Sequence, residues 1–240
     1  MQAKLINQSS AVKKFRTLVT AALAAIVTSS AHAVSLTPGD TVTLGGTTSL
    51  LRPELAGTVL VDTIRPFSVD LGLSVPGAGV ISGTVQDRVV REDGTGTLDF
   101  YYRVFNSDSS SGLVIRASRT SFGSLTTDVD FRTDGLGSVG PTPAFRTADG
   151  KEIQFNFSQF AGVGNSLPAA TTSRFFFVHT DATSFDEKGT LFLDVTSHAG
   201  EVPIGVELRL PTYQPVPLSG AALLLGSGLA GLGFLRRRVS

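Results

Sequence analysis

The stretch TLDFYYRVF, residues 97–105, decides the fold class, because its apolar and polar side chains alternate residue by residue. Successive side chains of an extended strand point to opposite faces of a sheet, so this alternation predicts one apolar face and one polar face. The apolar face carries Leu98, Phe100, Tyr102 and Val104, and the polar face carries Asp99, Tyr101 and Arg103. Strands with two unlike faces are typical of antiparallel sheets that pack one side against a core.

The same alternation recurs between residues 34 and 213. It is found in KEIQFNF (151–157), TLFLDVT (190–196) and GVELRL (205–210), and further strands are expected at 58–64, 67–75, 80–90, 113–119, 128–132 and 174–179. The dipeptide Asp-Gly, a good turn former, occurs at 93–94, 134–135 and 149–150. No segment between residues 34 and 213 shows a convincing 3.6-residue period of apolar side chains, the pattern of an amphipathic helix. The sequence therefore predicts an all-β domain, an antiparallel two-sheet β-sandwich of either jelly-roll or immunoglobulin-like topology.

Residues 1–33 have the three parts of a secretory signal peptide. The start is positively charged through Lys4, Lys13, Lys14 and Arg16. A short apolar core follows at 18–27, interrupted only by Thr20. Ala31 and Ala33 are small residues at the spacing that signal peptidase reads, which predicts cleavage after Ala33. The alternative is an uncleaved N-terminal anchor, for which this apolar core is short.

An uncharged segment and three arginines close the chain. Residues 218–235 are 18 residues without a charge. As a helix they would span roughly 27 Å, close to the thickness of the hydrocarbon core of a bilayer. Arg236, Arg237 and Arg238 follow, and such a basic cluster favours the cytoplasmic side. The alternative is a buried core helix, which seldom runs so far without a charge. The chain thus divides into a signal peptide (1–33), an exported β-sandwich domain (34–213) and a C-terminal segment with one transmembrane helix (214–240).

The exported segment is acidic, although the whole chain is neutral. Residues 34–213 hold 13 basic and all 20 acidic residues, a net charge of −7. Binding to nucleic acid or to anionic lipid head groups needs a basic surface, so neither is expected as a partner of this domain. The chain has no cysteine, so this exported domain has to rely on its hydrophobic core, without disulfides.

The sequence gives little sign of catalytic chemistry. The exported part has two histidines, His179 and His198, and no cysteine, which leaves few ligands for the common zinc sites. Serine and aspartate are plentiful, but the Gly-x-Ser-x-Gly nucleophile motif is absent from the chain. His179, at the end of a predicted strand, is expected to be hydrogen-bonded or hydrated. No residue is predicted to be catalytic, and no cofactor is indicated.

One acidic pair is a candidate for metal binding. Asp128 and Asp130 lie two residues apart in a predicted strand, so both carboxylates could meet a hard cation such as Ca²⁺ on one face. The spacing does not match the EF-hand loop, whose fifth position falls on Arg132. The alternative, which we prefer, is a solvated acidic face paired with Arg132 or Arg119.

The C-terminal segment resembles a known sorting signal. Val216, Pro217, Leu218 and Ser219 are followed by the uncharged run and then by the three arginines. This order resembles the PEP-CTERM signal of Gram-negative bacteria, closest to its Val-Pro-Leu-Pro-Ala variant, with Ser219 in place of the second proline. The resemblance implies recognition by an exosortase, a membrane enzyme similar to a transpeptidase, and cleavage near the motif. It also implies an association with exopolysaccharide and biofilm matrix. It covers only the C-terminal segment and implies nothing about residues 34–213.

Three classes of function remain open. We expect an exported, non-enzymatic cell-surface or extracellular-matrix protein, first held in the inner membrane with its domain outward. Its expected partners are signal peptidase, an exosortase-type enzyme, the membrane and exopolysaccharide. A carbohydrate- or calcium-binding surface module is the alternative, and a secreted hydrolase is the third class. A concave pocket lined by carboxylates would favour the hydrolase, whereas a shallow face with exposed aromatic side chains, such as Tyr101 beside Arg103, would favour the sugar-binding module.

Overall fold

Two antiparallel sheets face each other and enclose the hydrophobic core. The computed structural model describes residues 34–72, 79–157, 166–197 and 205–217. Within these residues the one helical element is a single 3-10 turn, η1 (Pro53–Leu55). The prediction of an all-β, two-sheet sandwich is confirmed. The expected signal helix and transmembrane helix fall on residues outside the described part of the chain.

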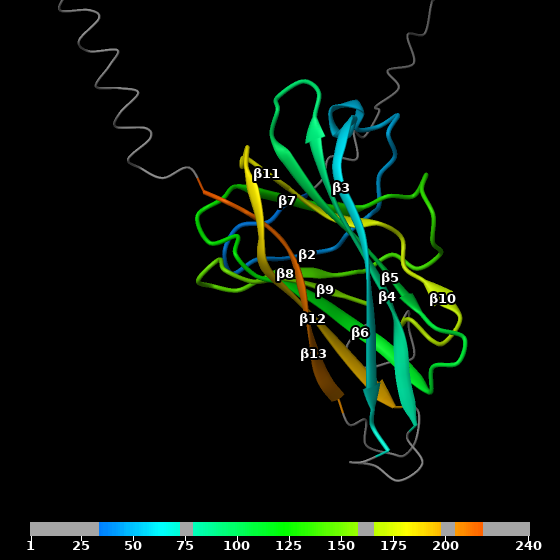
Figure 1. Ribbon diagram of the computed structural model, residues 1–240. Helices are drawn as coiled ribbons and strands as arrows, with labels where there is room; N and C mark the ends of the chain where they lie inside the picture. The colour runs from blue at the N-terminus through cyan, green and yellow to red at the C-terminus, as the bar shows by residue number, and fades with distance from the viewer. Residues whose placement is uncertain (1–33, 73–78, 158–165, 198–204, 218–240) are drawn as a thin grey trace, which may run out of the picture.

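Seven strands form the first sheet, and six of them follow one another in hydrogen-bonded order (Figure 1). From edge to edge these six are β1 (Val34–Ser35), β7 (Thr127–Phe131), β11 (Phe176–Thr180), β5 (Leu98–Asn106), β4 (Val80–Glu92) and β3 (Gly57–Asp70). The seventh, β10 (Thr171–Thr172), pairs with β5 beside this path.

The second sheet has six strands, and all pairings between named strands in both sheets are antiparallel. Its order is β13 (Gly205–Pro215), β12 (Phe185–Ser197), β6 (Gly112–Arg119), β9 (Ile153–Asn156), β8 (Ala144–Arg146) and β2 (Thr41–Val42). From β5 to β12 the chain repeatedly crosses from one sheet to the other, so residues far apart in sequence meet in the core.

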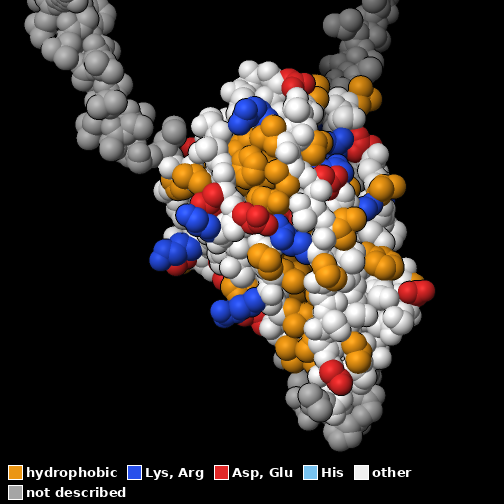
Figure 2. Space-filling model, in the orientation of Figure 1, with side chains coloured by type: hydrophobic (Ala, Val, Ile, Leu, Met, Phe, Trp, Pro, Cys, Tyr) orange, Lys and Arg blue, Asp and Glu red, His pale blue; other side chains and the backbone are white. Residues whose placement is uncertain are grey.

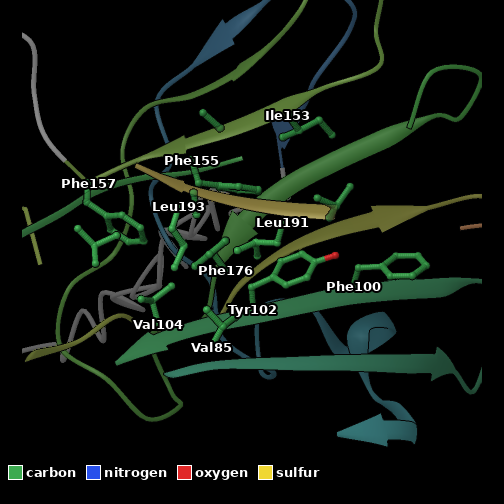
Figure 3. Packing of buried hydrophobic residues seen from close by; sticks show 14 of the residues in the cluster. Val85, Phe100, Tyr102, Val104, Ile153, Phe155, Phe157, Phe176, Leu191 and Leu193 are labelled. Atoms are coloured by element: carbon green, nitrogen blue, oxygen red, sulfur yellow. The ribbon is translucent and has the colours of Figure 1, made fainter. Parts of the chain in front are cut away.

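The inner faces of the two sheets supply the core (Figure 3). Tyr102 of β5 and Phe176 of β11, from the first sheet, lie in one buried cluster with Phe155 of β9 and Leu193 of β12, from the second. Phe100 of β5 belongs to the same cluster, and its ring packs edge-on against Phe122. The ring centroids of Phe155 and Phe176 lie 4.7 Å apart, a close aromatic contact. The four residues of the predicted apolar face of the stretch 97–105, Leu98, Phe100, Tyr102 and Val104, are fully buried, as the alternation predicts.

The outer face of the first sheet is partly covered, and here the prediction from alternation was wrong. Tyr101 was assigned to the polar face but is only 5% exposed. It belongs to a second apolar cluster on this face, formed by Leu55, Val90, Tyr101, Phe175 and Phe177. Leu55 comes from η1, in the connection between β2 and β3, where the sequence predicted no element. The middle of the first sheet therefore has apolar contacts on both faces.

The edge strand β3 joins two predicted strands into one. The segments 58–64 and 67–75 were predicted separately, but β3 runs through Pro66 to Asp70. Proline has no N–H to donate and is tolerated in edge strands, and β3 pairs only with β4 among the described strands. Val59 and Ile64 on this strand are 49% and 64% exposed, and Figure 2 shows a band of hydrophobic side chains over the region where β3 runs in Figure 1.

Candidate functional site

Polar side chains meet on the first sheet where β4 ends, β5 begins and β11 ends. Asp99 of β5 is the register partner of His179 on β11. On its other side Asp99 pairs with Val90 of β4. The short turn between β4 and β5 then brings Glu92, the last residue of β4, beside His179. Because the three side chains come from three adjacent strands, the register of the sheet fixes their arrangement. We call Glu92, Asp99 and His179 the carboxylate–histidine cluster.

His179 contacts both carboxylates through one ring nitrogen. Its Nδ1 lies 2.7 Å from Asp99 Oδ1 and 3.2 Å from Glu92 Oε1. The hydroxyls of Thr95 and Thr97 donate hydrogen bonds to the other oxygen of Glu92, Oε2. Asp99 and Glu92 are 0% and 2% exposed, whereas the His179 side chain is 24% exposed. The histidine therefore lies between two buried carboxylates and the solvent.

Burial and proximity shift the pKa values within the cluster. Burial raises the pKa of Asp99 to about 6, although the hydrogen bond and the charge of His179 oppose this rise. Burial alone would lower the pKa of His179, but the hydrogen bond to Asp99 and the charges of Asp99 and Glu92 raise it above its usual value. Buried carboxylates need a positive partner, so this arrangement is suited to holding a proton or a cation.

The predicted acidic pair on β7 is divided between two environments. Asp130 is buried, and its Oδ1 accepts the backbone N–H groups of Gly46 and Phe131 at 2.8 and 2.9 Å. Burial raises the pKa of Asp130. Asp128 is instead the register partner of His179. The expected arginine partners are engaged elsewhere, since Arg132 pairs with Asp134 and Arg119 is buried in the core.

A pocket of about 500 Å³ lies on the same outer face. Tyr101 and Phe175 line it together with Arg88 and Arg132, and Leu136 stands at its exposed rim. Burial raises the pKa of the Tyr101 phenol above its usual value, so this group is a neutral phenol. The pocket thus combines aromatic walls with polar groups, which is typical of a small-ligand site.

The arginines of this pocket have acidic partners in fixed positions. Arg132 donates from Nε and Nη2 to both carboxylate oxygens of Asp134 at 2.8 Å, and this pairing holds the pKa of Asp134 well below its usual range. Arg88 donates to Asp62 at 2.7 Å, and its guanidinium lies 4.7 Å from the centroid of the Phe175 ring. Among the described residues that line the pocket, Asp134 is the only carboxylate.

The predicted processing sites lie at or beyond the ends of the described fold. β13 ends at Pro215, and the N–H of Val216 donates to the carbonyl oxygen of Ser184 at 2.9 Å. Pro217, which follows, is exposed. At the other end β1 begins at Val34, the residue after the predicted cleavage position. The remaining residues of these predictions lie outside the described part, namely Ala31, Ala33, Leu218, Ser219, Arg236, Arg237 and Arg238.

Comparison with known proteins gives no match, since no family model, no curated protein and no solved structure is significantly similar to this chain. In the part of the chain that the structure describes, no helix has the length and hydropathy needed to span a membrane. An assignment of function therefore depends on the terminal segments and on the geometry of the outer face.

Sequence reasoning did not find the carboxylate–histidine cluster. His179 was interpreted as a hydrogen-bonded or hydrated residue, and its partners were not identified. The only signals in the sequence are an acidic residue at the start of one strand and a histidine at the end of another. These signals become a site only once β5 and β11 are known to be neighbours in a fixed register.

Proposed function

We propose that this protein is an exported, non-enzymatic component of the cell surface or extracellular matrix, delivered by a C-terminal sorting signal. The observation that carries the proposal is the order of parts in the tail: Val216 to Ser219, then 18 uncharged residues, then three arginines. An exosortase-type enzyme would recognise this tail and cut near Pro217. The start of the motif follows the end of β13 directly, which supports a cut in an accessible segment next to the folded domain.

The proposal includes processing at the N-terminus. A signal helix within residues 1–33 would direct export, and signal peptidase would cut after Ala33. Val34 would then be the first residue of the mature protein, where it pairs with Val129 at the edge of the first sheet. The transmembrane helix at 218–235 would hold the precursor in the inner membrane until the second cut. Exopolysaccharide is the proposed partner of the released domain.

The finer architecture is also part of the proposal. The repeated crossing of the chain between sheets from β5 to β12 supports a jelly-roll-like strand order over an immunoglobulin-like one.

A second candidate function, carbohydrate binding, is favoured by the pocket on the outer face. Tyr101 and Phe175 offer aromatic surface, and the paired Arg132 and Asp134 offer fixed donors and acceptors to hydroxyl groups. Glycoside hydrolysis commonly needs two carboxylates. In the described part of the chain Asp134 is the only carboxylate that lines this pocket, and it is engaged by Arg132. The pocket therefore supports a binding module over a hydrolase.

Fractionation of cells that produce the protein tests the main proposal. Wild-type protein should be found outside the inner membrane, at the surface or in the matrix. Replacement of Arg236, Arg237 and Arg238 by Glu should leave the domain unchanged but impair the orientation and processing of the precursor. Normal delivery of this variant would contradict the proposed role of the tail.

A further inference from the structure

We propose that Glu92, Asp99 and His179 form a binding site for a divalent transition-metal ion of the zinc class. This inference does not depend on the export function, because it rests on the folded domain alone. The three side chains offer one imidazole nitrogen and two carboxylate oxygens within 4.8 Å of one another. One nitrogen and two oxygens from three residues form a donor set that zinc accepts in proteins.

Two buried oxygen atoms of the cluster accept no hydrogen bond, although one of them, Glu92 Oε1, lies 3.2 Å from His179 Nδ1. Asp99 Oδ2 and Glu92 Oε1 make no hydrogen bond with any described residue, although both side chains are almost completely buried. Leaving a buried charged oxygen without a hydrogen bond is costly, and native proteins seldom do so without a reason. A cation bound to the cluster would give Glu92 Oε1 a partner directly. It would also balance the charge of the Asp99 carboxylate, whose Oδ1 contacts the same histidine and whose Oδ2 has no hydrogen bond.

The donor types and the charge favour zinc over calcium or magnesium. Ca²⁺ and Mg²⁺ prefer six or more oxygen ligands, whereas an imidazole nitrogen suits zinc and its neighbours among the transition metals. Two carboxylates and a neutral imidazole carry a charge of about −2, which a divalent ion balances. The positive charge of the buried Arg52 acts on Asp99 but is itself paired with Glu54. Asp128, opposite His179 on β7, adds negative charge beside the site.

The surroundings of the cluster hold the ligands in place. Thr95 and Thr97 fix Glu92 Oε2, which leaves Oε1 directed toward His179. Hydrogen bonds from outer groups of this kind commonly orient metal ligands. Ligand atoms of a tetrahedral zinc ion lie about 3.4 Å apart. The contacts of 2.7 and 3.2 Å therefore need to open only slightly when His179 gives up its proton. Entry is from the partly exposed side of His179.

Metal titration of the purified full-length protein tests this proposal. The protein, without a histidine tag, is stripped with a chelator and titrated with Co²⁺ and Zn²⁺, with visible absorption and calorimetry as readouts. We expect one equivalent of Co²⁺ with the absorption bands of a low-coordinate ion, displaced by Zn²⁺ but not by excess Ca²⁺. His179→Gln and Asp99→Asn should each weaken binding by about a hundredfold or more, because each removes one of three ligands.

Two matched variants separate this site from other donors. His198→Gln removes the other histidine of the exported part, and Asp130→Asn removes an acid that is bound by backbone N–H groups. Both should keep the wild-type dissociation constant within about threefold. X-ray absorption at the zinc edge of the wild-type protein should show a single imidazole among oxygen ligands, even if Asp99→Asn fails to fold. Any one of three results would overturn the proposal: no stoichiometric binding of metal, unchanged metal binding in His179→Gln, or a preference for Ca²⁺ over Zn²⁺.

Discussion

Asp99 and His179 are register partners on β5 and β11, and His179 Nδ1 lies 2.7 Å from Asp99 Oδ1. The carboxylate is fully buried, while the histidine reaches the surface. A buried charge of this kind is stable only with its partner, so the pair should contribute to folding whether or not a metal binds.

In metal-free protein, His179→Ala should lower the free energy of unfolding by about 2–4 kcal/mol, because it leaves the buried carboxylates without a positive partner. In a double-mutant cycle with Asp99→Asn, the two changes should be non-additive by about 1 kcal/mol or more. Denaturant unfolding of the wild type, the two single variants and the double variant, all in a chelating buffer, measures this interaction energy. Additive effects would show that the two side chains do not stabilise each other.

The guanidinium group of Arg146 should be required for stability, so that lysine cannot replace it. It is 2% exposed and donates to the carbonyl oxygens of Leu36, Phe122, Leu125 and Gly150. Lysine lacks the planar fork of donors, so Arg146→Lys should destabilise the domain by about 2–4 kcal/mol. Arg209→Lys is the matched control, since its side chain is 74% exposed and should change stability by less than about 0.5 kcal/mol. Equal denaturation midpoints for the two variants would contradict this account of Arg146.

Blocking the pocket should reduce binding to polysaccharide without unfolding the domain. Val59 lines the pocket and is 49% exposed, so Val59→Arg would fill the opening while leaving the core intact. Ile64→Arg is a matched control on the same strand, because Ile64 is 64% exposed and does not line the pocket. In a pull-down with exopolysaccharide from the same cells, we expect at least a tenfold loss for Val59→Arg alone. Similar binding by both variants would remove the support for a sugar site.

Asp134 should stabilise the protein at neutral pH but not in acid. Its pKa is lowered in the folded state, mainly by the hydrogen bond from Arg132. A carboxyl group with a lowered folded pKa contributes stability above its unfolded pKa of about 3.9 and loses it as the pH falls toward the folded pKa. Asp134→Asn should therefore be less stable than wild type at pH 7, and the difference should shrink below about pH 4. Thermal melting across this range measures it, with Asp108→Asn on an exposed turn as control. A difference independent of pH would argue against the ion pair as its cause.

The inner faces of the sheets could be predicted from the sequence, but the outer site could not. Leu98, Phe100, Tyr102 and Val104 are buried as the period of two requires, since this pattern is local to one strand. By its position in the alternation Tyr101 should be exposed. It is buried because η1 brings Leu55, more than forty positions earlier in the chain, over it. The sequence predicted separate strands at 58–64 and 67–75, but β3 continues through Pro66, which an edge strand accommodates.

The carboxylate–histidine cluster has the same origin in long-range contacts. Glu92 and Asp99 are joined by a local turn, which the Asp93-Gly94 dipeptide marks in the sequence. His179 joins them only because β11 inserts between β5 and β7. Periodicity within single strands carries no information about which strands become neighbours or in which register. This is why the sequence directed attention to Asp128 and Asp130 instead.

Intact mass of the extracellular protein tests the central proposal most directly, because one spectrum reports both ends of the chain. We expect a species that begins at Val34, after signal peptidase has cut behind Ala33, and that ends near Pro217, without the uncharged segment and the three arginines. A precursor that keeps residues 218–240 should be confined to the inner membrane. An extracellular species that begins at Val34 but still ends at Ser240 would contradict the sorting-signal proposal and would identify the tail as a permanent anchor.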